Sequence, residues 1–161
     1  MLKHTTGNLI DLAEQGEFDI IVHGCNCLNT MGSGIAKEIR ERYPQAYEAD
    51  TKFSQMNTPE EKLGKFSVAF NTFEPEVHQF VIVNAYTQLN FMPRGVDHFE
   101  YASFEVILKK MLHEYGTFKI GFPRIGQGLA GGNPERINQM LSDFAVAVSE
   151  KGGTVTVVEF A

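Results

Sequence analysis

The stretch from Phe18 to Arg42 constrains the fold more than any other part of the chain. It begins with a short apolar run rich in β-branched residues, which is typical of a buried central strand. A turn rich in glycine and asparagine follows, and Ile35, Ile39 and Tyr43 then recur at four-residue spacing, as in an amphipathic helix. A glycine loop that leads from a strand into a helix gathers free N–H groups at the positive end of the helix dipole. This stretch therefore predicts a binding site for a phosphate-bearing ligand.

A second glycine loop, residues 124–133, also follows a predicted strand and precedes a predicted helix, with Pro134 at the first helical position. In an open α/β sheet, ligands bind beyond the carboxyl ends of the strands, so two such loops on neighbouring strands predict a cleft suited to a diphosphate. Neither loop ends in the GK[ST] of a P-loop. The second loop is also a poor match to the dinucleotide fingerprint, because no strand with a ribose-binding acid follows about 20 residues later. The second loop contains four glycines in seven residues, at positions 126, 128, 131 and 132.

The rest of the chain alternates predicted strands and helices. Pro44 is expected to end or kink the preceding helix, and Asp97 to cap a long helix that Gly116 stops. Residues 58–62 are expected to form a turn, with Pro59 suited to the first position of a helix or to a turn. The pattern predicts one α/β domain over residues 1–161, with a mixed sheet between helices. Further strands are expected at 1–6, 64–70, 79–85, 118–123 and 154–160, and helices at 9–15, 97–115 and 134–150.

Charge and cysteine content exclude several classes of protein. The formal net charge of −6 argues against broad binding to nucleic acid or to anionic membranes, and no apolar run approaches the length of a membrane span. Cys25 and Cys27 lie two residues apart, so in an extended strand they point to opposite faces and are not expected to form a disulfide. Two cysteines cannot complete a zinc site. We therefore expect a reduced, cytoplasmic protein with no metal and no cofactor.

The two loops together carry a resemblance to a known family. The segments IVHGCNCLNTMGSGIAKEIRERYP and FPRIGQGLAGGNPERI, with an early GNLI, resemble a macro domain over essentially the whole chain. The resemblance implies the three-layer α/β/α macro-domain fold and ADP-ribose as the ligand. The HGCNC form of the first loop is similar to the branch that includes the ADP-ribose 1''-phosphate phosphatases.

The resemblance also implies roles for particular positions. Asn8 stands where many relatives carry an Asp that accepts from the adenine amino group, and Leu9 would offer a backbone N–H beside it. Phe160 would be a platform for the adenine ring or, equally, a core residue. Asn26 would hold the distal ribose. The diphosphate would lie between Gly32, Ser33, Gly34 and Ile35 on one side and Ile125, Gly126, Gln127, Gly128 and Leu129 on the other.

Two polar residues, His23 and Asn26, are the candidates for catalysis at the reactive end. Histidine suits proton transfer near neutral pH, and Asn26 could hold the attacking water. No nucleophile–base pair is evident, so catalysis would depend on positioning and electrostatic stabilisation. The alternative for His23 is a hydrogen-bonded structural residue. Cys25 or Cys27 as a nucleophile is the weaker alternative to a small buried residue in a tight turn.

Some family positions differ in this chain. One hydrolytic branch carries an Asp just after the glycine run, where this chain has Ala36. Another branch carries a Lys and an Asp at the positions of Asn84 and Ala130 in this chain. De-ADP-ribosylation by those two mechanisms is therefore not expected. Gln88 and Arg94 follow a central strand, on a loop that could cover the distal ribose.

Three functions remain open at this point. The first is a phosphatase that hydrolyses ADP-ribose 1''-phosphate, the second is a non-catalytic ADP-ribose reader, and the third is a hydrolase that removes ADP-ribose from modified protein or nucleic acid. We expect a monomer whose partner is a small-molecule ligand, with no membrane and no nucleic acid except as an ADP-ribosylated substrate.

Overall fold

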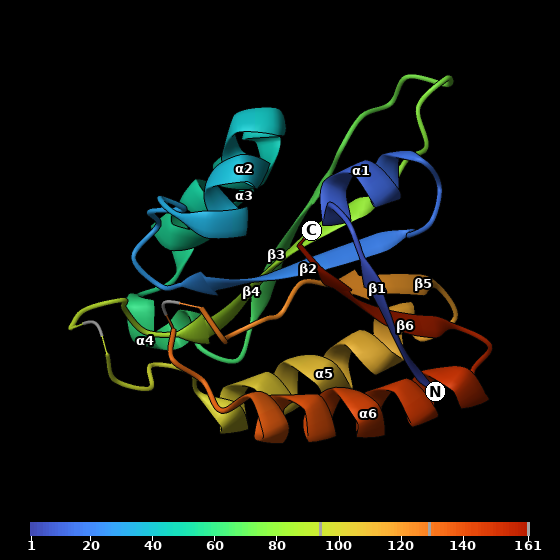
Figure 1. Ribbon diagram of the computed structural model, residues 1–161. Coiled ribbons are helices and arrows are strands. Elements are labelled where there is room, and N and C mark those ends of the chain that lie inside the picture. The colour runs from blue at the N-terminus through green and yellow to red at the C-terminus, as the bar shows by residue number, and fades with distance from the viewer. Residues whose placement is uncertain (94, 129, 161) are drawn as a thin grey trace.

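The computed structural model describes residues 1–93, 95–128 and 130–160. Its centre is a six-stranded sheet with the strand order β1-β6-β5-β2-β4-β3 (Figure 1). The strands are β1 (Leu2–Thr6), β2 (Ile20–Asn26), β3 (Phe66–Phe70), β4 (Val81–Gln88), β5 (Lys119–Phe122) and β6 (Thr154–Glu159). The helices in this part of the chain are α1 (Leu9–Glu14), α2 (Gly34–Arg42), α3 (Pro44–Met56), α4 (Pro59–Lys62), α5 (Tyr101–Tyr115) and α6 (Pro134–Glu150).

The sheet is mixed, as the sequence predicts. Strand β3 pairs antiparallel with β4, whereas the β1–β6, β6–β5, β5–β2 and β2–β4 pairs are parallel. The central strands β2 and β4 are buried along most of their length, which explains why they read as continuous apolar runs. The parallel strands end at the same edge of the sheet, and this edge is where the two glycine loops begin.

The helices form layers on both faces of the sheet, which confirms the three-layer α/β/α arrangement. Figure 1 shows α5 and α6 along one face, with α1, α2 and α3 over the other. Each face has its own apolar core. The core under α5 and α6 includes Phe104, Ile107, Ile137 and Leu141, and the core under α1 to α3 includes Ile10, Ile39, Ala46 and Phe80.

Three local predictions are corrected by the structure. Pro44 does not only end a helix: it begins α3 at a position where its missing N–H is harmless. Residues 58–62 are not a plain turn, because Thr58 and Glu61 form a reciprocal capping box that starts the short helix α4. Asp97 does not cap α5, because the N-cap of this helix is Glu100. The carboxylate of Asp97 instead accepts from the N–H of Phe99 at 2.9 Å.

The two central strands run further than their apolar segments. Strand β2 continues through Asn26, beyond the apolar run that ends at Val22, and β4 continues through Gln88, beyond the expected end at Ala85. The extension follows from a third small apolar cluster, made by Cys25, Cys27 and Tyr86. A register shift after Cys25 then pairs Asn26 with Gln88. Asn26 and Gln88 therefore occupy paired positions on neighbouring strands at the edge where the loops begin.

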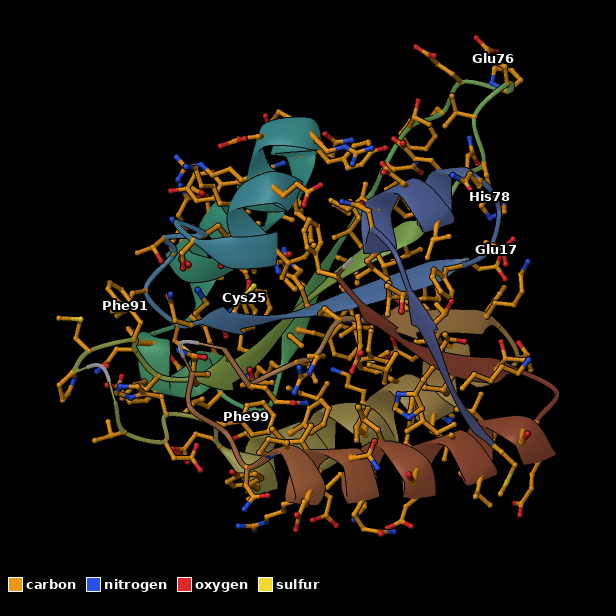
Figure 2. The ribbon with its side chains drawn as sticks, viewed as in Figure 1. Glu17, Cys25, Glu76, His78, Phe91 and Phe99 are labelled. Atoms are coloured by element: carbon orange, nitrogen blue, oxygen red, sulfur yellow. The ribbon has the colours of Figure 1, made fainter. Side chains whose placement is uncertain are left out.

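The connection between β3 and β4 extends away from the body of the molecule, with Glu76 near its tip (Figure 2). It lies far from the glycine loops. Within the described residues, the longest and most apolar helices still fall short of what crossing a membrane requires.

Candidate functional site

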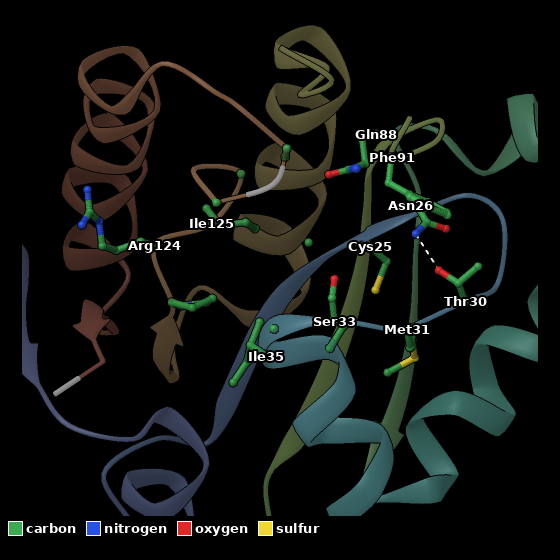
Figure 3. A pocket seen from close by; sticks show the side chains of 18 residues that line it. Cys25, Asn26, Thr30, Met31, Ser33, Ile35, Gln88, Phe91, Arg124 and Ile125 are labelled. Carbon is green, nitrogen blue, oxygen red and sulfur yellow. Dashed lines mark hydrogen bonds between the residues drawn. The ribbon is translucent and has the colours of Figure 1, made fainter. Parts of the chain in front are cut away.

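The two glycine loops meet at one cleft, as the sequence predicts. The cleft has a volume of about 680 Å³, within the usual range for small-molecule sites. Figure 3 shows it between the start of α2 and the loop after β5, with Gln88 and Phe91 at a third side. Its described lining is Gly24, Cys25, Asn26, Thr30, Met31, Gly32, Ser33, Gly34, Ile35, Ala36, Gln88, Phe91, Pro123, Arg124, Ile125, Gly126, Gly128 and Ala130.

The first wall of the cleft is the start of α2. Ser33 is the N-cap, but its hydroxyl makes no capping hydrogen bond to the helix. The first N–H groups of any helix have no intrahelical acceptor, and here they border the cleft at Gly34, Ile35 and Ala36. Gly34 has a φ of 57°, which favours glycine over other residues. This wall therefore presents N–H donors, a hydroxyl and the positive end of a helix dipole to a ligand.

The second wall is the loop after β5. Ile125 is buried beneath it, and Gly126 combines a φ of 73° with close packing on a ring. A Cβ added at Gly126 would lie 2.3 Å from Cδ1 of Phe99. The carbonyl of Gly126 accepts from the N–H of Gly132 at 2.7 Å, which closes the loop on itself. Gly128, in contrast, has no atom within 4 Å of such a Cβ and stands open at the cleft.

Asn26 lies at the end of β2 on the floor of the cleft. Its Oδ1 accepts from the N–H of Leu28 and its Nδ2 donates to Oγ1 of Thr30, both at 2.8 Å. These two bonds fix the orientation of the amide, and Figure 3 draws the second. Opposite, Nε2 of Gln88 donates to the carbonyl of Asn90 at 2.9 Å. The two amides are placed to hydrogen-bond a polyhydroxyl group.

The cleft has few ionisable groups. Among its described lining residues only Cys25 and Arg124 carry an ionisable side chain, so no carboxylate or imidazole borders it there. Arg124 is exposed, and its guanidinium donates to Oε1 of Gln127 at 3.1 and 3.2 Å. In Figure 3 this side chain points away from the centre of the cleft. The arrangement therefore favours binding by amides and dipoles over acid–base chemistry by side chains.

His23 is not brought to the cleft. It is fully buried, and its Nε2 lies 2.6 Å from Oδ1 of Asn84, which requires the N–H on that nitrogen. Burial lowers the pKa of the imidazole to about 4, opposed by the hydrogen bond to Asn84. The histidine is therefore neutral near pH 7. Of the two interpretations from the sequence, this position fits the hydrogen-bonded structural residue.

The two cysteines are free and buried. Cys25 lines the cleft, but burial, with the charge of Asp50 adding to it, raises the pKa of its thiol well above the ordinary value. Burial likewise raises the pKa of Cys27 to about 11. Because the thiolate is the nucleophilic form, neither environment activates a cysteine.

The residues expected at the adenine end lie outside this cleft. Asn8 caps α1, where its Oδ1 accepts from the N–H of Asp11 and its Nδ2 donates to Glu38, both at 2.9 Å. Phe160 is 79% exposed and so is not a core residue. The N–H of Gly7 donates to the carbonyl of Glu159, so the ends of β1 and β6 lie side by side there.

Of the expected ligand contacts, the cleft brings together Asn26, Gly32, Ser33, Gly34, Ile35, Ile125, Gly126 and Gly128. Asn8, Leu9, Gln127 and Phe160 do not line it. Leu129 and Arg94 fall outside the described residues.

Sequence reasoning missed Thr30, Met31 and Phe91 as lining residues. Thr30 and Met31 precede the glycine run, and Met31 has a φ of 43° that no sequence signal marks. Phe91 follows β4, and the rule that parallel strands end at one edge was the signal that could have found it.

Solved structures of other proteins have the same arrangement of strands and helices. The macrodomain of Mycobacterium tuberculosis DarG superposes with a TM-score of 0.75 at 22% identity, over 99% of this chain and 97% of that one. Thermosipho africanus DarTG in complex with ADP-ribose superposes with a TM-score of 0.77 at 15% identity, over 98% of this chain and 41% of that one. The fold is therefore the macrodomain fold, which confirms the resemblance found in the sequence.

Comparison of amino-acid sequences then finds a relative of higher identity. It is 33% identical over 150 residues to an uncharacterized 17.5 kDa protein from the tk-vs intergenic region of Enterobacteria phage T4, covering 90% of each chain. The chain belongs to the same family as that phage protein. A shorter match, 37% identical over 46 residues, links 29% of this chain to 21% of an ADP-ribose 1''-phosphate phosphatase from Aspergillus oryzae. No family model matches the chain.

Proposed function

We propose that the cleft binds ADP-ribose. The observation that carries this proposal is the meeting of two glycine loops at one cleft, with the start of α2 on one side and the loop after β5 on the other. Backbone N–H groups and the helix dipole of α2 on one side of the gap, with a glycine-rich backbone on the other, suit a diphosphate. The likeness to a DarTG structure that contains ADP-ribose supports the same ligand.

The position of polar groups gives the bound molecule a direction. The diphosphate lies between Ser33–Gly34 and Gly126–Gly128, and the distal ribose lies at Asn26 and Gln88, whose amides suit its hydroxyls. The adenosine half extends toward the ends of β1 and β6, where Phe160 is exposed. Phe160 then serves as a platform for the adenine ring.

Hydrolysis of ADP-ribose 1''-phosphate is the second candidate, and the partial similarity to a phosphatase favours it. In that reaction water attacks phosphorus, the bond from phosphorus to the 1''-oxygen breaks, and ADP-ribose leaves with that oxygen. Because the described lining holds no carboxylate or imidazole, the proton lost by the water moves through a phosphate oxygen to the leaving oxygen. The protein's part is to position the phosphate and to stabilise its charge with N–H groups.

One calorimetric experiment separates these functions. The protein is titrated with ADP-ribose, and phosphate release from ADP-ribose 1''-phosphate is then measured on the same sample. Binding with release supports the phosphatase. Binding without release supports a reader or a hydrolase of another linkage, and absence of binding overturns the proposal.

The variant Gly128→Val tests whether ADP-ribose binds at this cleft. Gly128 lines the cleft, has no atom within 4 Å of an added Cβ and is not in the left-handed region, so the variant should fold normally. Its side chain would occupy the space of the diphosphate. We expect affinity for ADP-ribose to fall by about tenfold or more, which corresponds to ~1.4 kcal/mol or more. Unchanged affinity in the variant would remove the second loop from the binding site.

A further inference from the structure

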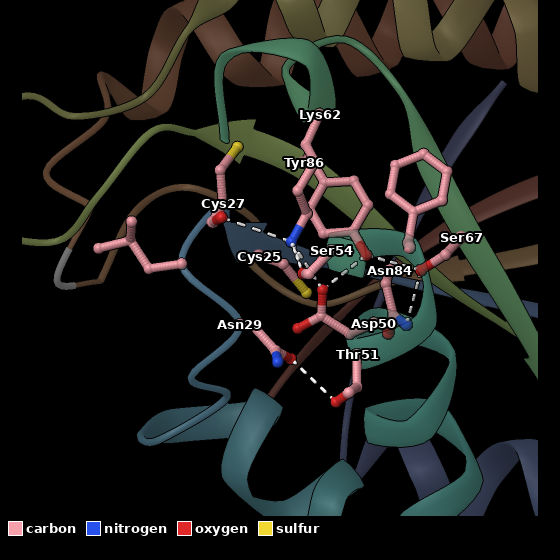
Figure 4. A network of polar contacts seen from close by, with 12 residues as sticks. Cys25, Cys27, Asn29, Asp50, Thr51, Ser54, Lys62, Ser67, Asn84 and Tyr86 are labelled. Atoms are coloured by element: carbon pink, nitrogen blue, oxygen red, sulfur yellow. Dashed lines mark hydrogen bonds and ion pairs between the residues drawn. The ribbon is translucent and has the colours of Figure 1, made fainter. Parts of the chain in front are cut away.

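The loop between β2 and α2 is held from behind by side chains of two helices. The phenol of Tyr47, on α3, donates to the carbonyl of Asn29 at 3.0 Å. Nη1 of Arg40, on α2, donates to the next carbonyl, that of Thr30, at 2.9 Å. Thr51 adds a bond from its hydroxyl to Oδ1 of Asn29 at 3.3 Å, which Figure 4 draws. Two consecutive carbonyls thus point toward the helices.

Arg40 and Tyr47 also contact each other. The guanidinium carbon of Arg40 lies 3.8 Å from the centre of the Tyr47 ring, as in a cation–π pair. Each side chain therefore restricts the other while it holds its own carbonyl. We call this pair the Arg40–Tyr47 clamp.

The clamp determines where two N–H groups point. In a trans peptide the carbonyl and the following N–H point in opposite directions. Because the carbonyls of Asn29 and Thr30 are held on the helix side, the N–H groups of Thr30 and Met31 face the other way, and both residues line the cleft. Neither N–H has an acceptor within the described residues.

The backbone needs such a restraint. Asn29 has a φ of 60° and Met31 a φ of 43°, in the left-handed region that residues other than glycine seldom adopt. Such conformations persist where the surroundings hold them, and they cluster at ligand sites. Where left-handed residues alternate with others along a loop, successive N–H groups point into one concavity that can bind an anion.

We propose that Arg40 and Tyr47 are positioning residues for the ligand. The clamp presents the N–H groups of Thr30 and Met31 to an anionic or hydroxyl oxygen at the distal end of ADP-ribose. This inference rests on the proposed function, and it adds a binding element that lies before the glycine run. The charge of Arg40 polarises the peptide group between Thr30 and Met31, because its guanidinium bonds the Thr30 carbonyl. This strengthens the N–H of Met31 as a donor.

The test uses Tyr47→Phe, Arg40→Gln and a control, Lys37→Gln. Tyr47→Phe removes one hydroxyl and keeps the ring, and Arg40 is exposed, so both variants should fold. Lys37 lies on the same helix, exposed and paired only with Glu41 at 3.9 Å. Because a hydrogen bond contributes about 0.5–1.5 kcal/mol, we expect each clamp variant to lose about twofold to tenfold in ADP-ribose affinity, and the control to lose nothing.

A second readout distinguishes positioning from general support. Amide chemical shifts and hydrogen exchange of Thr30 and Met31, recorded without ligand, should change in Tyr47→Phe and Arg40→Gln but not in Lys37→Gln. If the wild type binds ADP-ribose and the clamp variants bind it equally well, the inference is wrong. If the wild type binds nothing, the proposed function fails, and unchanged amide signals in the variants would separately overturn the clamp.

Discussion

The two loops that form the cleft reach a defined shape by different means. The loop between β2 and α2 is held by side chains of neighbouring helices, which bond its carbonyls. The loop after β5 is held by a bond within its own backbone, by glycine contacts too close for a side chain and by the segment around the start of α5, where the N–H of His98 donates to the carbonyl of Ala130. A loop of the first kind depends on residues far away in the sequence. A loop of the second kind depends on the absence of side chains within it.

Lys62 lies beneath the first loop and gives the largest expected effect. The side chain of Lys62 is fully buried. Its Nζ lies 2.9 Å from Oδ1 of Asp50, 2.6 Å from Oγ of Ser54 and 3.4 Å from the carbonyl of Cys27. Figure 4 draws these contacts as dashed lines. Lys62→Met leaves the Asp50 carboxylate buried without its counter-ion. We expect a loss of about 3–5 kcal/mol in the free energy of unfolding, measured by urea denaturation.

The double variant Lys62→Met/Asp50→Asn is the control for this prediction. It removes both charges, so it should be more stable than Lys62→Met alone. A single variant that lost less than about 1 kcal/mol would show that this buried pair does not hold the first loop.

Gly126→Ala examines the second loop. The new Cβ would overlap the ring of Phe99 at 2.3 Å, at a residue with a φ of 73°. We expect a loss of about 2–4 kcal/mol from overlap and backbone strain, seen as a lower melting temperature. Gly128→Ala, in the same loop but with open space around it, should melt close to the wild type. Equal melting temperatures for the two variants would show that the second loop does not depend on a glycine at position 126.

His23 gives a smaller and pH-dependent effect. Its pKa is lowered from 6.5 to about 4 in the folded protein, so between these values the unfolded chain binds a proton that the folded protein excludes. Stability should therefore fall as the pH drops through this window, by about 1.4 kcal/mol per pH unit, and level off below it. His23→Gln should lack this component when the two unfolding curves are compared across pH. Parallel curves would mean that the imidazole is not kept neutral by burial.

The same substitution examines catalysis. Because His23 does not line the cleft, His23→Gln should retain ADP-ribose affinity and any phosphate release. Loss of release with intact binding would restore the histidine as an acid–base residue.

Sequence reasoning found the parts of the fold and site that local patterns determine. The helix from Pro134 to Glu150, the alternation of strands and helices along the chain and both glycine loops follow from apolar periodicity and from glycine positions. The burial of His23 could not be predicted in this way, because it depends on Asn84 of the neighbouring strand, whose Nδ2 donates to the carbonyl of Ala46 in α3. The use of Asn8 as a helix cap was equally hidden, since an asparagine before a helix can serve either the helix or a ligand.

The pairing of β1 with β6 also matters for handling the protein. Because β1 and β6 run parallel, the N-terminal end of β1 and the C-terminal end of β6 lie at opposite ends of the strands, and Phe160 follows β6 at the end where the glycine loops begin. A purification tag or a surface-immobilisation linker placed ahead of Leu2 keeps clear of the binding edge. A tag at the C-terminal end would follow Phe160, the proposed platform for the adenine ring, so the choice of terminus should itself alter the measured affinity.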